Sequence, residues 1–133
     1  MKKLIEKGLI VFTLLLVATG TALAQIPDEL VVSLKEGNDK VLSSYFNENI
    51  ELVLPGQDDV FSKAQAQQLV ARFFKENTPD DFSIAHKGTS GNDGAHYAIG
   101  KLSTSRGNFR VYFLLKYNQG KAYLHQLRIE KQS

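Results

Sequence analysis

The imidazole of His125 is the group in this chain best suited to chemistry, because a histidine side chain can serve as a base or as a hydrogen-bond donor. It lies in the segment 122–130, where apolar and polar side chains alternate as they do in a strand. If residues 118–120 form a three-residue turn, His125 falls opposite Phe113 on the apolar inner face of a sheet. A core histidine that bonds a backbone carbonyl or a tyrosine hydroxyl is the structural alternative to a functional one.

Other groups that bind metals or form covalent intermediates are sparse. The chain has no cysteine, no Gly-x-Ser-x-Gly motif and no phosphate-binding glycine loop. His86 and His96 lie near predicted strand ends, where solvent exposure is the usual outcome, and the three histidines lack the short spacing of zinc ligands. We therefore expect no metal and no cofactor, and the candidate catalytic residues are His125 and Tyr123.

Three alternating segments, separated by turn residues, must position His125. They are residues 95–103, 109–117 and 122–130. A two-residue turn at Arg106-Gly107 would place Gly100 opposite Phe113, which leaves space beside the histidine on the inner face. The residues expected to line a ligand pocket there are Phe113, His125, Tyr123, Leu115, Gly100 and, from a helix, Phe73.

The reverse face of the same strands has an aromatic and aliphatic centre. Its expected members are Tyr97, Ile99, Tyr112, Leu114 and Leu124. An uncovered apolar patch usually marks an interface, so we expect a homodimer or an envelope protein partner on this face. Arg110 and Arg128 are expected directly opposite each other, where their like charges repel. An ion-pair network with Glu51 and Glu130 would offset this repulsion, and a bound anion is the alternative.

The residues before the meander predict three helices and three strands. Helices are expected over 27–37, 38–46 and 62–77, and strands over 50–54, 59–61 and 82–87. The clearest helix begins at Ser62, whose spacing to Gln65 is that of a capping box. The order predicts an α+β domain: a curved antiparallel sheet, made of a four-strand C-terminal meander and an N-terminal hairpin, packs on three helices.

The N-terminus reads as a secretory signal peptide. Basic residues precede an apolar run over 9–17, and small residues follow up to Ala24, after which we expect cleavage. Residues 25–133 then form a single domain with equal numbers of basic and acidic side chains. We expect an exported protein, periplasmic or secreted, with no stable membrane anchor after cleavage and no attraction to nucleic acid.

The order of elements resembles the cone-shaped fold of the nuclear transport factor two superfamily, which is also called cystatin-like. Several stretches are similar to those of a bacterial exported family, domain of unknown function 4783. These stretches are Ile26-Pro27, Tyr45-Phe46, 60–66, 97–100, 109–116 and 125–130. The resemblance implies the cone fold but carries no established activity, since the superfamily includes isomerases, dehydratases and noncatalytic modules.

Three functions are compatible with this pattern. The one we favour is a noncatalytic exported module that binds a small apolar ligand in the cone or a protein partner on the outer sheet face. An isomerase or dehydratase would use His125 as its base and Tyr123 or Tyr45 as a donor, but the inner positions of the last three strands carry no carboxylate of the kind such enzymes place inside the cone. A structural part of an envelope assembly is the third alternative.

Overall fold

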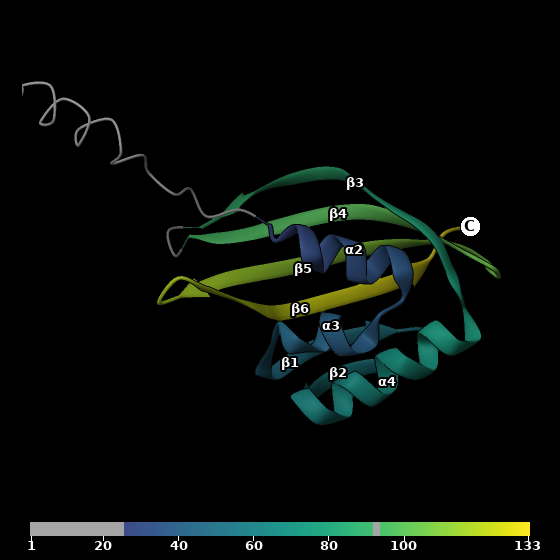
Figure 1. Cartoon of the computed structure of the whole chain (residues 1–133), viewed down its shortest axis with the longest axis horizontal. Coiled ribbons are helices and arrows are strands. Elements are labelled where there is room, and N and C mark those ends of the chain that lie inside the picture. The colour runs from purple at the N-terminus through teal and green to yellow at the C-terminus, as the bar shows by residue number, and fades with distance from the viewer. Residues whose placement is uncertain (1–25, 92–93) are drawn as a thin grey trace, which may run out of the picture.

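A computed structural model describes residues 26–91 and 94–133, which form one six-stranded sheet with three helices on one face (Figure 1). The helices are α2 (Asp28–Glu36), α3 (Asp39–Ser44) and α4 (Lys63–Glu76). The strands are β1 (Phe46–Leu54), β2 (Gln57–Ser62), β3 (Pro79–Ser90), β4 (Ala95–Thr104), β5 (Gly107–Asn118) and β6 (Lys121–Lys131). The predicted signal peptide, residues 1–24, lies outside the described residues.

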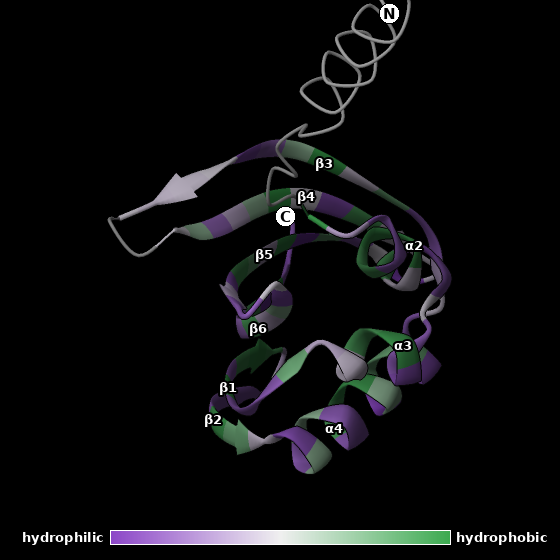
Figure 2. Ribbon diagram, turned by 60° about the vertical axis from the view of Figure 1, so that its left-hand side comes forward, coloured by the Kyte–Doolittle hydropathy of each residue, from purple (hydrophilic) through white to green (hydrophobic). Residues whose placement is uncertain are grey.

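The strand order is β2-β1-β6-β5-β4-β3, so the hairpin and the meander join through β1 and β6. These two strands are parallel, whereas every other neighbouring pair is antiparallel. The α+β prediction is confirmed, but the sheet is mixed and not wholly antiparallel. Figure 2 shows the sheet curving around the helices, which lie on its concave side.

The helices begin and end where local chemistry predicts. Ser62 accepts a hydrogen bond from the backbone N–H of Gln65, whose side chain reaches back to the Ser62 N–H, so the predicted capping box is present. Gly37 ends α2 in the left-handed conformation with φ of 69°. α3 ends at Ser44, two residues earlier than predicted, and Phe46 already belongs to β1.

The predicted register between β4 and β5 is wrong by two residues. The turn is Ser105-Arg106 and not Arg106-Gly107, because Thr104 pairs with Gly107. Gly100 therefore lies opposite Val111, and Ala98 lies opposite Phe113. A shift of two keeps every side chain on its predicted face, so the inner face of these two strands is still the apolar one.

The predicted register between β5 and β6 is also wrong, and here the error changes faces. The turn has two residues, Gln119 and Gly120, with φ of 52° and 78°, which is the pair of positive values that a tight hairpin requires. Farther along, the pairing shifts between Leu114 and Leu115. Opposite this shift, β6 carries one extra residue, a β-bulge that contains His125.

The concave side holds a single apolar core. Its largest fully buried side chains come from all parts of the fold: Phe46, Phe113, Leu30, Leu34, Leu42, Ile50, Leu52, Leu102, Leu115, Leu124, Leu127 and Ile129. Since the chain has no disulfide, burial of this apolar surface supplies the main stabilisation. Within the described part of the chain, no helix is long and apolar enough to span a membrane.

Candidate functional site

Most of the residues predicted to line a ligand pocket inside the cone lie in the packed core. Phe113 and Leu115 are fully buried, and Phe73 packs edge-to-face on another core ring. Gly100 leaves no space for a ligand, because a Cβ at this position would lie 2.6 Å from Cζ of Phe82. The Phe82 side chain therefore occupies the room that the sequence suggested for a ligand.

His125 and Tyr123 do not belong to the buried inner set. Leu124 and Leu127 are fully buried, whereas His125 and Tyr123 are half-buried. Tyr123 pairs with Lys116, and the ammonium group of Lys121 lies 5.5 Å from its ring centroid. The isomerase hypothesis needed a buried histidine among the inner residues, whereas His125 is half-buried at the bulge.

A group of polar side chains that the sequence did not reveal lies where α2, α3 and β5 approach each other. The Tyr45 hydroxyl donates a hydrogen bond of 2.8 Å to Oε2 of Glu29. Partial burial, together with this bond, raises the pKa of Tyr45 to about 12. His96 is half-buried and not exposed as predicted, and its ring lies edge-on to that of Tyr117 at 5.7 Å. No local spacing signals this group, because its members are far apart in the sequence.

The outer face keeps the predicted apolar centre with one correction. Tyr97 lies directly opposite Leu114, and Ile99 lies directly opposite Tyr112. All four side chains are half-buried, and the two tyrosine rings stack with centroids 6.4 Å apart. Leu124 was also predicted here, but it is fully buried in the core because the register of β6 differs.

His86 extends this apolar centre toward the edge strand. It is exposed, as predicted, and its Nε2 atom is joined by a hydrogen bond of 3.0 Å to the Tyr97 hydroxyl. Gly88 lies beneath the same ring, since a Cβ there would approach the Tyr97 hydroxyl to 2.9 Å. The orientation of Tyr97 is therefore set from β3.

The charged side chains of the outer face separate by sign. Lys101 lies directly opposite Arg110, and both side chains are exposed. Arg110 also lies opposite Glu130 on β6, and not opposite Arg128 as predicted. Arg128 forms an ion pair of 3.9 Å with Glu130. Two adjacent cations on β4 and β5 destabilise the sheet unless carboxylates approach them.

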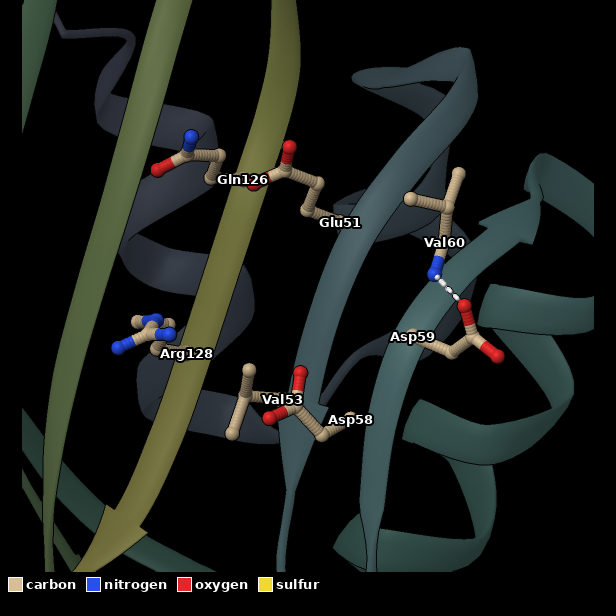
Figure 3. Close-up of a pocket in the computed structure, with 7 residues that line it drawn as sticks. All are labelled: Glu51, Val53, Asp58, Asp59, Val60, Gln126 and Arg128. Atoms are coloured by element: carbon tan, nitrogen blue, oxygen red, sulfur yellow. Dashed lines mark hydrogen bonds between the residues drawn. The ribbon is translucent and has the colours of Figure 1, made fainter.

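Carboxylates gather at the other side of the face, over the β1–β2 hairpin. A shallow groove of about 250 Å³ lies here. Its lining side chains come from β1, β2 and β6 (Figure 3). Its lining residues are Glu51, Val53, Asp58, Asp59, Val60, Gln126 and Arg128. A second groove of about 360 Å³ shares Glu51, Gln126 and Arg128 and continues to Arg110 and Tyr112. The two grooves connect the acidic hairpin with the apolar centre.

Metal ligation has no candidate in the residues that the structure describes. No three His, Asp or Glu side chains of 26–91 and 94–133 come together in a geometry that could hold a metal ion. What the outer face offers instead is a broad surface with an apolar centre, an acidic side and a basic side.

Comparison with solved structures first defines the class of protein. The fold is NTF2-like: a variant of the protein Rd1NTF2_05 matches with a TM-score of 0.58 and 14% identity, covering 77% of this chain and 90% of that protein. At this identity, the likeness shows the fold alone.

The family follows from closer matches. The family model described as domain of unknown function (DUF4783) matches residues 27–130, and the chain belongs to this family. A DUF4783 protein from Bacteroides ovatus is 33% identical, with a TM-score of 0.75 over 81% of this chain and 96% of that one. One from Bacteroides fragilis is 31% identical, with a TM-score of 0.75 over 81% of this chain and 100% of that one. No curated protein matches significantly.

Proposed function

We propose that this protein is a noncatalytic interaction module that associates through its outer sheet face, and that the partner is a second copy of the chain. The observation that carries the proposal is the apolar quartet of Tyr97, Ile99, Tyr112 and Leu114. These side chains pair across β4 and β5 on the convex side of the sheet, where no helix of the described residues lies (Figure 2). Apolar patches in such a position usually serve association.

The size of the face supports a stable interface. Six strands of about ten residues, spaced about 4.8 Å apart and rising about 3.3 Å per residue, present a face of about 900 Å². A standard protein–protein interface covers about 800 Å² on each partner. The whole outer face is therefore about as large as one side of a standard interface, and on this convex surface the contact would centre on the apolar quartet.

The charge pattern supports a second copy as the partner. A two-fold axis that runs parallel to the strands, between the two facing sheets, would lay β1 and β2 of one copy over β4 and β3 of the other. The acidic hairpin that carries Glu51 and Asp58 would then lie over the side of the other copy that carries Lys101. Opposite charges on facing sides of the two copies would favour this arrangement.

The proposal also includes the compartment in which the protein associates. The basic, apolar and small-residue pattern of residues 1–24 supports export, after which the remaining chain would associate outside the cytoplasm.

A pair of glutamate substitutions tests the outer face directly. Leu114→Glu introduces a charge into the centre of the quartet, and we expect it to abolish association of the purified protein in light scattering. Val32→Glu is the matched control, because Val32 is 44% exposed on α2, on the helical side of the molecule. The proposal is overturned if the Leu114→Glu variant self-associates as strongly as the Val32→Glu variant and the unmodified protein do. If the unmodified protein associates only with another envelope protein, that protein and not a second copy is the partner.

A further inference from the structure

A separate cleft lies at the end of the cone where α4 terminates, away from the outer face. Its volume is about 740 Å³, which is within the usual range of small-molecule sites. It is bounded by the last turns of α4, the β1–β2 turn, the β4–β5 turn and the end of β6. Four separate segments of the chain therefore converge on it.

The floor of this cleft is apolar and packed. Phe73 and Phe109 meet edge-to-face, with ring centroids 5.0 Å apart and planes at 82°. Leu54 and Leu69 complete the apolar lining. A chain or ring that lies on these residues would remove apolar surface from water on both sides of the contact.

The rim of the cleft is cationic. Arg72 and Arg106 are exposed, and within the described parts of the chain neither guanidinium forms an ion pair. Lys131 donates a hydrogen bond to the Arg106 carbonyl oxygen, and its ammonium group lies 5.0 Å from the Phe109 ring centroid. Glu76 is the one carboxylate among the lining residues. Three cations outweigh this carboxylate and the partial negative charge at the end of α4.

The wall that carries Arg106 is held in place by backbone hydrogen bonds. The N–H of Ser105 donates to the Thr78 carbonyl oxygen at 2.9 Å, and the N–H of Thr78 donates to the Ser105 hydroxyl at 3.2 Å. Thr104 closes the turn from within, since its hydroxyl donates to the Gly107 carbonyl oxygen at 2.8 Å. The β4–β5 turn and the end of α4 therefore form one preorganised wall.

We propose that this cleft binds an amphipathic anion, an apolar chain or ring that carries one carboxylate. The apolar part lies on Phe73 and Phe109, and the carboxylate is held at the rim by Arg72 and Arg106. Guanidinium groups suit this role because they form paired, charge-assisted hydrogen bonds to carboxylates. This site is independent of the association through the outer face.

Decanoate, kept below its micellar concentration, is the probe, and decan-1-ol is the neutral ligand of equal chain length. We titrate each into isotopically labelled protein and follow the backbone amide signals. Decanoate is expected to shift the signals of Arg72, Phe73 and Arg106 and to bind at least tenfold more tightly than the alcohol. The double variant Arg72→Gln/Arg106→Gln is expected to lose at least tenfold in decanoate affinity while its affinity for the alcohol is unchanged.

The control removes the same charge from the outer face, in the double variant Arg110→Gln/Arg128→Gln. This variant is expected to bind decanoate as the unmodified protein does. Equal affinities for decanoate and the alcohol, an undiminished affinity of the Arg72/Arg106 variant, or signal shifts confined to other surfaces would each overturn the assignment. The mapping on the unmodified protein decides the question even if the variant folds poorly.

Discussion

The ring of Phe82 lies directly over Gly100, so close that a single added carbon on the glycine would be 2.6 Å from Cζ of the ring and 2.6 Å from the Ser83 carbonyl oxygen. This contact joins the edge strand β3 to β4 and closes the inner face beside Val111 and Ala98. The sequence suggested free space beside Gly100, but the Phe82 ring fills that space and makes it part of the packed core.

Gly100→Ala is therefore expected to destabilise the protein by about 1–3 kcal/mol through overpacking. Both neighbours are rigid, since one is a buried ring and the other is backbone, so neither moves easily. Gly56→Ala is the control, because Gly56 has φ of 85° and nothing within 4 Å, which limits its cost to backbone strain of about 1 kcal/mol. Urea unfolding measures the free energy of unfolding of both variants. A Gly100→Ala variant that is no less stable than the unmodified protein would contradict this packing.

Leu124 and His125 test the register of β6. Leu124→Ala is expected to lower the free energy of unfolding by about 2–5 kcal/mol, since the side chain is fully buried. His125→Ala, at the neighbouring half-buried bulge position, is expected to cost about 1 kcal/mol or less. Denaturant unfolding compares the two variants, and a larger loss for His125→Ala would place the histidine inside the cone after all.

Tyr45 is expected to ionise near pH 12, above the ordinary tyrosine pKa of 10.0. A raised pKa in the folded state means that the contribution of this group to stability is complete below about pH 10 and is lost as the pH rises toward 12. Tyrosinate absorbance followed against pH measures the transition, and Tyr45→Phe is expected to remove the late component. If the variant and the unmodified protein give the same titration curve, the hydrogen bond to Glu29 does not control this phenol.

The charge pattern of the outer face predicts that two charge reversals together restore the self-association that each one alone weakens. Lys101→Glu and Glu51→Lys are each expected to weaken self-association several-fold, because each places like charges across the interface. The double variant restores opposite charges with the signs exchanged, and it is expected to associate more tightly than either single variant. Sedimentation velocity measures the three variants, and an additive loss in the double variant would show that these two regions do not meet.

The parts of the fold that local chemistry specifies could be predicted from the sequence. The capping box of Ser62 and Gln65 and the glycine that ends α2 act within a few residues, so their patterns identify them. The inner and outer faces of β4 and β5 were also predictable, because a shift of two residues preserves the alternation.

The features that depend on distant residues could not be predicted. Whether the last hairpin has a two- or three-residue turn, and whether β6 bulges at His125, is decided by packing across the sheet and not by the alternating pattern. The contact of Phe82 with Gly100 and the hydrogen bond of Tyr45 to Glu29 join separate segments of the chain. The errors at His125, Tyr123 and Leu124 all follow from the one misassigned turn and bulge.

The most direct test of association through the outer face is the mass of the unmodified protein by sedimentation equilibrium, measured up to tens of micromolar. A two-fold interface over Tyr112 and Leu114 predicts twice the mass of one chain, with a shift toward the single-chain mass on dilution. A single-chain mass throughout this range would contradict the proposal that the outer face binds a second copy.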